Sequence, residues 1–302
     1  MRTLVTGATG FVGKRLLEQL ERPVVLSRNV EQARRALPGA TVFPWDPMRG
    51  PPPREAFDDV EAVIHLAGDP VAEGRWNDAK KKRIRDSRTI GTKNFVDGIR
   101  SAAKPPAVLV SASAVGYYGN RGDEVLDERA QPTNDFLADV CVEWEAAAHE
   151  AESLGVRVVN PRIGIVLGPG GGALSKMLLP FKLGMGGRLG DGRQWMPWVH
   201  LDDLVQLILY AMRTPQLRGP VNAVAPNPVT NRDFTAVLAK VLHRPAILPV
   251  PAFGLRLAVG EFAEILLASQ RVVPRAAEQA GYTFRYPELK PALEAILRGD
   301  RS

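Results

Sequence analysis

The chain has 302 residues, a formal charge of +6 and a sequence pI of about 9.6. Its composition, 45% hydrophobic and 24% charged, is typical of a globular protein with one large domain or one domain and an added lobe. No apolar run reaches the length of about 18 residues that a membrane span needs, which argues against an integral membrane protein.

A single cysteine, Cys141, excludes an internal disulfide and is typical of a reducing compartment. The N-terminus enters the first apolar run directly and leaves no room for a cleaved signal, so we expect a cytoplasmic protein. The densest basic stretch covers residues 80–85 and is followed by Arg88. It lacks interleaved aromatic residues, so we expect a solvated helix face, with no nucleic-acid or membrane partner. An anionic small molecule is the alternative ligand for this charge.

Residues 6–13 read Thr-Gly-Ala-Thr-Gly-Phe-Val-Gly and stand between a short apolar run and a segment with helical periodicity. Gly7 permits a tight turn, Gly10 lets the backbone approach a pyrophosphate, and Gly13 lets the helix pack closely on the strand. The N-terminus of that helix offers N–H groups to an anion. The spacing G-x-x-G-x-x-G differs from the commoner G-x-G-x-x-G. Its strand–turn–helix context nevertheless predicts a nucleotide site.

After this unit, apolar strands and amphipathic helices alternate through the first half of the chain. The predicted strands span residues 23–27, 41–43, 62–68, 107–111 and 156–161, and the predicted helices span residues 30–37, 76–103 and 134–154. Near-continuous apolar strands suit a sheet that is buried on both faces. The alternation predicts an α/β fold built on a Rossmann-type, doubly wound parallel sheet.

Beyond Leu167 the rhythm changes. The predicted elements are a loop at 168–172, a helix at 173–182, a loop at 184–192, a helix at 201–212 and a strand at 221–224. From residue 227 onward, prolines separate short helices. We expect a dinucleotide-binding core over residues 1–225, with 168–200 contributing to the substrate lobe. A smaller C-terminal α/β lobe over residues 226–302 is expected to form a substrate or lid domain.

The residues at the end of the second strand indicate which dinucleotide the site takes. An acid there would bind the 2′-hydroxyl of NAD, whereas an arginine suits the 2′-phosphate of NADP. This chain has Ser27 and Arg28 there, and no acid. The guanidinium of Arg28 offers a planar fork to a phosphate, and Ser27 offers a hydroxyl. We predict NADP(H) as the cofactor; the alternative is that Arg28 is a surface charge on a loop.

Three motifs follow one another in the chain: residues 6–13, His-Leu-Ala-Gly at 65–68, and Ser-Ala-Ser-Ala-Val-Gly-Tyr-Tyr-Gly at 111–119. In order and rough spacing they resemble the extended short-chain dehydrogenases/reductases. More specifically, essentially the whole chain resembles the atypical subgroup labelled epimerase family proteins. The matching segments are residues 75–77, 87–88, 144–148, 164–172, 197–200 and 224–226, and residues 281–289 resemble the subgroup's small C-terminal domain of unknown function.

The resemblance implies a Rossmann core that binds NADP(H) at the C-terminal ends of the strands, with a substrate cleft beneath the C-terminal lobe. The implied pyrophosphate contacts are Gly7, Gly10, Phe11 and Val12, and the implied adenosine-phosphate contacts are Ser27 and Arg28. The implied contacts near the adenine-side ribose are Leu66, Ala67 and Gly68, with Arg88 of the long helix near the cofactor. The implied neighbours of the nicotinamide half are Ser111, Ala112, Arg162 and Ile163.

The catalytic pattern of the family is broken in this chain. Extended reductases and epimerases carry Tyr-x-x-x-Lys after the fifth strand, where the tyrosine exchanges a proton with the substrate and the lysine lowers its pKa. The corresponding positions hold Phe136 and Val140, which cannot transfer a proton. The remaining candidates are Ser113, at the place of the family's substrate-orienting hydroxyl, and Tyr117 or Tyr118. A tyrosine can still donate a hydrogen bond to a carbonyl that receives hydride; packing at the strand end is the alternative.

No histidine or cysteine pair has metal-ligand spacing, so we predict no metal site. Asp202 or Asp203 is expected to cap the following helix and to dock the lobe. We expect an NADP(H)-dependent oxidoreductase that acts on a small carbonyl or hydroxy substrate of unknown identity. The alternative is an NADP(H)-bound sensor or partner-binding protein without catalysis. A nucleotide-sugar epimerase ranks lowest, because it depends most on the missing tyrosine–lysine pair.

Overall fold

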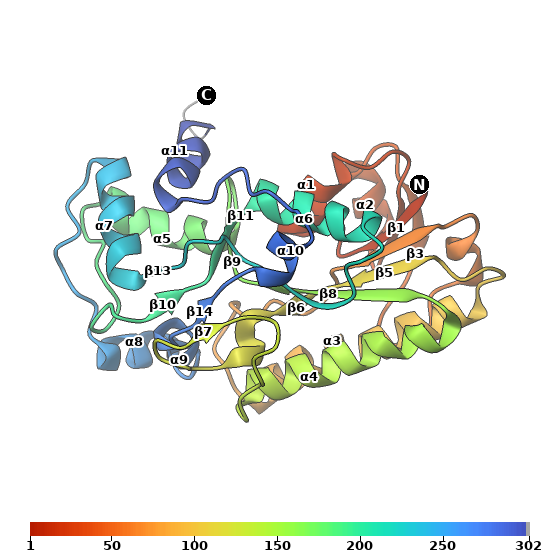
Figure 1. Cartoon of the computed structure of the whole chain (residues 1–302), viewed down its shortest axis with the longest axis horizontal. Coiled ribbons are helices and arrows are strands. Elements are labelled where there is room, and N and C mark those ends of the chain that lie inside the picture. Colours follow the sequence, from red (N-terminus) through yellow and green to blue (C-terminus); the bar gives the residue numbers. More distant parts are fainter. Residues whose placement is uncertain (300–302) are drawn as a thin grey trace.

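The computed structural model describes residues 1–299. Its centre is an eight-stranded sheet in which every strand pair is parallel (Figure 1). From edge to edge the strands are β12 (Gly219–Ala223), β8 (Arg157–Ile163), β5 (Val108–Ser111), β4 (Ala62–His65), β1 (Thr3–Thr6), β2 (Val24–Ser27) and β3 (Thr41–Pro44), with β6 (Ser113–Ala114) paired to β8. The strand order reverses between β1 and β4. In open α/β sheets, ligands bind at such a switch point, outside the carboxyl ends of the strands.

Helices cover both faces of this sheet (Figure 1). On one face lie α1 (Phe11–Leu17), α2 (Val30–Ala36) and α6 (Leu201–Arg213), and on the other α3 (Asp78–Ser101) and α4 (Phe136–His149). Neighbouring residues of a strand point to opposite faces, so Val5 packs with the first group and Leu4 with the second. Both faces of the sheet are therefore buried from solvent, which explains the near-continuous apolar strands. The predicted Rossmann-type, doubly wound α/β fold is confirmed.

Side-chain caps set the starts of the long helices. Asn77 accepts the backbone N–H of Lys80 at 2.8 Å at the start of α3. Asp135 accepts two backbone N–H groups at the start of α4, from Leu137 and Ala138. Each cap satisfies donors that the first helical turn leaves without a partner.

The start of α6 differs from its sequence-based prediction. Its N-cap is His200, whose Nδ1 accepts the backbone N–H of Asp202 at 3.0 Å. The prediction that Asp202 or Asp203 caps this helix is therefore wrong. Asp202 instead accepts a hydrogen bond from Arg15 at 2.7 Å. Asp203 accepts the backbone N–H groups of Arg285 and Tyr286 at 2.8 and 2.9 Å, so it does dock the C-terminal segment.

A smaller lobe lies beyond the C-terminal ends of the strands (Figure 1). Its core joins α5 (Gly172–Lys182), α7 (Asn231–Leu242) and α11 (Leu289–Gly299) to the buried Trp198. Among the described residues, three two-stranded pairs lie outside the main sheet: β9 (Ile165–Leu167) with β11 (Trp198–His200), β10 (Trp195–Met196) with β13 (Val229–Thr230), and β7 (Val125–Leu126) with β14 (Arg271–Val272). The remaining α-helices are α8 (Ala252–Val259), α9 (Phe262–Leu267) and α10 (Arg275–Gln279). Elsewhere in the chain, the 3₁₀ helices are η1 (Arg54–Phe57), η2 (Val115–Tyr118) and η3 (Glu150–Leu154). Within residues 1–299, no helix combines the length and apolar character that crossing a bilayer demands.

Candidate functional site

The glycine loop after β1 is a tight turn in which glycines allow close contacts between backbone segments. Gly7 has φ of +70°, a conformation that favours glycine, and its carbonyl accepts the N–H of Gly10 at 3.0 Å. A Cβ on Gly7 would lie 2.7 Å from the carbonyl carbon of Leu66, and a Cβ on Gly13 would lie 2.2 Å from the oxygen of Gly7. The close approach of α1 and of the β4 exit to this loop therefore depends on glycine at both positions.

A buried hydrogen-bonded group ties the exit of β4 to the end of β1. Thr6 Oγ1 accepts the backbone N–H groups of Leu66 and Ala67, both at 3.2 Å, and lies 2.7 Å from His65 Nδ1. The threonine hydrogen therefore points to Nδ1, and His65 Nε2 donates to Thr92 Oγ1 at 3.1 Å. Burial lowers the pKa of His65 to about 3, so the ring is neutral at pH 7. This arrangement fixes Leu66 and Ala67 beside the glycine loop.

Two residues of the basic stretch on α3 turn toward the loop after β4. Lys80 is buried, and its Nζ donates to Asp69 Oδ2 at 2.5 Å. For Lys80, the expectation of a solvated helix face is therefore wrong, because α3 packs this side of its first turn against the loop. Arg88 Nη1 donates to the carbonyls of Asp69 and Ile84 at 3.0 and 3.1 Å. A Cβ on Gly68 would lie 3.2 Å from Arg88 Cζ, so this cation lies directly behind the exit strand.

The end of β2 presents an exposed cation. Ser27 Oγ donates to the carbonyl of Asn29 at 3.1 Å, and the Asn29 side chain caps α2. Arg28 lies between them and is exposed. Across residues 1–299, the Arg28 guanidinium has neither a hydrogen-bond partner nor a carboxylate within 4.0 Å, so its donors are available to a ligand.

A buried polar network lies where β6, β8 and α4 meet. Ser113 Oγ donates to Glu145 Oε1 at 2.6 Å. Arg162 donates to the same carboxylate through Nε and Nη2, both at 2.8 Å, in a bidentate ion pair. Arg162 Nη1 also donates to the Tyr118 hydroxyl at 3.0 Å, and that hydroxyl donates to Asn222 Oδ1 at 2.7 Å. One network therefore joins four segments that are far apart in the chain.

The two adjacent tyrosines have different surroundings. Tyr118 is 0% exposed, its hydroxyl is fully used, and burial raises its pKa to about 12. Tyr117 is half-buried, and its ring centroid lies 3.4 Å from Arg162 Cζ. The Tyr117 hydroxyl has no hydrogen-bond partner among residues 1–299. Of the two, Tyr117 is the tyrosine that has a hydroxyl left for a substrate.

Comparisons with known proteins identify the family of this chain. The model of the "NAD dependent epimerase/dehydratase family" matches residues 3–224, and a "domain of unknown function (DUF1731)" matches residues 250–296. The chain belongs to the NAD-dependent epimerase/dehydratase family. This confirms the resemblance seen in its motifs, including the distinct C-terminal domain.

Individual relatives of this family member cover nearly its whole length. It is 42% identical to the "epimerase family protein SDR39U1 homolog, chloroplastic" of Arabidopsis thaliana, over 99% of this chain and 87% of the relative. The crystal structure of human epimerase family protein SDR39U1 (isoform 2) with NADPH superposes with a TM-score of 0.87 at 34% identity, covering 99% of both chains. A nucleoside-diphosphate sugar epimerase from Corynebacterium glutamicum superposes at 0.78 with 35% identity, over 98% of this chain and 58% of that one.

The structure places Phe136 and Val140 at the start of α4, as the sequence predicted. Phe136 packs edge-on against Trp76 at 5.6 Å, and Val140 is buried. Cys141 beside them is also buried, and burial raises its pKa to about 12, so the thiol is not a nucleophile at neutral pH. Phe136, Val140 and the buried Cys141 therefore offer no proton-transfer group in place of the family's tyrosine and lysine.

Glu145 belongs to the candidate site, and sequence reasoning assigned it no role. It stands in a segment that matches the subgroup, and the apolar face of α4 holds Cys141, Trp144 and Ala148. Glu145 occupies the same face, four residues after Cys141. A carboxylate at a core-facing helical position is a usable signal, because a buried charge requires a partner. Only the folded structure shows that this partner is Arg162.

Proposed function

We propose that this family member is an NADP(H)-dependent oxidoreductase that acts on a small carbonyl or hydroxy compound. Arg28 carries the choice of cofactor, because its guanidinium is exposed and without an intramolecular partner in the described part of the chain. No acid stands at the end of β2 to bind the 2′-hydroxyl of NAD. The NADPH in the human relative's structure supports the same choice.

The residues around the switch point fit a dinucleotide. Gly7 and Gly10 bring backbone without a Cβ to the place where a pyrophosphate binds in this fold. Arg88 adds a cation behind Gly68 that donates only to backbone carbonyls among residues 1–299. The phosphate groups of a dinucleotide would balance the positive charge of Arg88.

Bound NADPH would supply hydride to a carbonyl carbon. Because Ser113 donates its hydrogen to Glu145, its oxygen is left as an acceptor for a substrate hydroxyl. The hydroxyl of Tyr117 is left to donate to a substrate oxygen. Arg162 holds both groups in place, since it pairs with Glu145 and lies against the Tyr117 ring.

Replacing Arg28 with alanine tests the cofactor choice. A charge-assisted hydrogen bond contributes about 1.5–3 kcal/mol, so we expect NADPH affinity to fall roughly 10- to 100-fold. NADH affinity should barely change, and calorimetric titration of both nucleotides measures the difference. Arg83→Ala, on an exposed position of α3, is the matched control. Equal losses for the two nucleotides, or affinity for neither in the unaltered protein, would contradict the proposal.

A sensor or partner-binding protein that holds NADP(H) without catalysis is the second candidate. Phe136 and Val140 favour it, because they remove the family's proton-transfer pair. The two functions separate when NADPH carrying deuterium at C4 is incubated with a panel of carbonyl compounds. Deuterium in a product supports the oxidoreductase, and tight NADPH binding with no transfer to any compound supports the sensor.

A further inference from the structure

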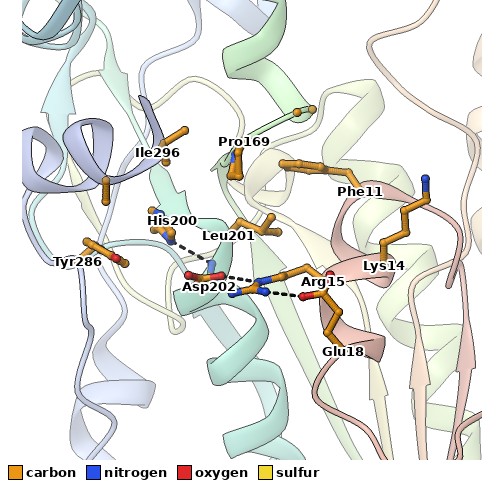
Figure 2. A pocket seen from close by; sticks show the side chains of 13 residues that line it. Phe11, Lys14, Arg15, Glu18, Pro169, His200, Leu201, Asp202, Tyr286 and Ile296 are labelled. Carbon is orange, nitrogen blue, oxygen red and sulfur yellow. Dashed lines mark hydrogen bonds and ion pairs between the residues drawn. The ribbon is translucent and has the colours of Figure 1, made fainter. Parts of the chain in front are cut away.

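A groove that shares only Phe11 with the predicted cofactor contacts lies between the sheet domain and the C-terminal lobe. Figure 2 shows that its walls come from α1, the start of α6, the loop at 169–171, Tyr286 and the helix α11. Its volume is about 630 Å³, within the range of small-molecule sites. Among the residues predicted to contact the cofactor, Phe11 alone lines it.

Two cations, Lys14 and Arg15, and two carboxylates, Glu18 and Asp202, line the groove. Arg15 pairs with both Asp202 and Glu18 (Figure 2), so both carboxylates are already engaged and this group of three side chains has a net charge of −1. Lys14 lies one residue earlier on α1 and is exposed. Its ammonium has no partner within residues 1–299. An anionic group of a ligand can therefore pair with Lys14 without displacing an existing ion pair.

His200 supplies a buried donor on the opposite wall. Its ring is 4% exposed and lies 4.0 Å from the Tyr286 ring, centroid to centroid. Nδ1 accepts the N–H of Asp202, which leaves the ring hydrogen on Nε2. Burial lowers the pKa of His200 to about 4, so this tautomer is neutral at pH 7. In the described part of the chain Nε2 has no partner, and the ring lines the groove.

Apolar side chains form the middle of the groove. The Phe11 ring and Pro169 lie on one side and Ile296 of α11 on the other (Figure 2). The loop glycines hold the ring of Phe11 in place, since a Cβ on Gly171 would lie 2.5 Å from it. The apolar wall is therefore built before any ligand arrives, which lowers the entropic cost of binding.

We propose that this groove is a second ligand site, specific for a small amphipathic organic anion. Its apolar body would lie between Phe11 and Ile296, an acceptor oxygen would meet His200 Nε2–H, and its negative charge would face Lys14. The site goes beyond the proposed oxidoreductase function, because none of the groups assigned to hydride transfer lies in it.

The fluorescent anion 1-anilinonaphthalene-8-sulfonate is a suitable probe, titrated into the full chain with and without saturating NADPH. Ala295→Trp places an indole in the groove, and we expect it to weaken probe binding at least about tenfold, a size typical of filling a pocket. Lys14→Ala should weaken binding by up to about fivefold, as expected for an exposed ion pair. Lys104→Ala, another exposed lysine outside the groove, should leave it unchanged.

Two further variants keep the result interpretable if Ala295→Trp fails to fold. Lys14→Glu alters only an exposed side chain and should reduce binding more than Lys14→Ala does. His200→Asn keeps an N-cap acceptor for α6, removes the ring donor, and should weaken binding by about fivefold. Probe affinity that is unchanged in all groove variants, or that NADPH abolishes, would overturn the proposal. If NADPH itself fails to bind, the variants in nucleotide-free protein still decide it.

Discussion

Tyr117 and Tyr118 are adjacent in the chain, yet their hydroxyl groups differ in their hydrogen-bond partners. Tyr118 Oη is held between Arg162 and Asn222, whereas the Tyr117 hydroxyl has no partner within residues 1–299. A buried hydroxyl with two partners stabilises the fold and is unavailable to a substrate. The same reasoning separates Ser113, whose hydrogen is taken by Glu145, from a serine that is free to donate.

Phenylalanine at each tyrosine position separates the two roles. Tyr118→Phe leaves buried Asn222 and Arg162 groups without a partner, so we expect a loss of about 1–3 kcal/mol in the free energy of unfolding. Tyr117→Phe should change that free energy by less than about 0.5 kcal/mol, and should lower kcat for carbonyl reduction. Denaturant titration and steady-state kinetics measure these effects. A larger stability loss for Tyr117→Phe than for Tyr118→Phe would contradict the assignment.

The first turn of α1 is an element whose position depends on one missing side chain. Gly13 lies against the Gly7 carbonyl and Ala8, so the helix approaches the glycine loop more closely than any other residue would allow. In α8, Gly254 has no atom within 4 Å of a Cβ built on it. A side chain would therefore clash with backbone at Gly13 and would meet open space at Gly254.

Alanine at each of these glycines should move stability in opposite directions. Gly13→Ala forces backbone apart and should destabilise the protein by about 1–3 kcal/mol, while also weakening dinucleotide binding. Gly254→Ala should be neutral or stabilise by up to about 1 kcal/mol, because alanine favours helix. Thermal unfolding with and without NADPH measures both. Equal behaviour of the two variants would contradict the close packing of α1.

At the scale of the whole molecule, the doubly wound sheet places a neutral histidine in its interior. His65 is 0% exposed and stacks on Phe95 of α3 at 4.7 Å, centroid to centroid. Its protonation in the folded state is disfavoured because no water reaches the ring. The unfolded chain binds this proton more readily, so the stability of the whole fold depends on pH.

The sign of that dependence follows from the lowered pKa of His65. Its pKa is about 3 in the folded chain against an ordinary 6.5, so stability is lost as pH falls below 6.5. Each pH unit costs at most about 1.4 kcal/mol. Between pH 6.5 and about pH 5, wild type should therefore lose about 1–2 kcal/mol more than His65→Asn. Denaturant titrations across this range measure the difference, and parallel curves for the two proteins would contradict it.

Local pattern was enough to predict the parallel sheet and the glycine turn, and resemblance to the family was enough to predict the broken tyrosine–lysine pair. Each depends on residues close together in the chain: apolar runs, glycine spacing, and Phe136 four positions before Val140. Arg28 at the end of the second strand was predictable for the same reason, as an end of a strand is a local feature.

Only the tertiary structure decided which polar groups meet. Glu145 and Arg162 pair across two elements, His200 displaces the expected aspartate as the cap of α6, and Lys80 turns inward. The groove joins Phe11 to Ile296, from opposite ends of the chain. A side chain's partner depends on how distant elements pack, and helical or strand periodicity carries no information on that packing.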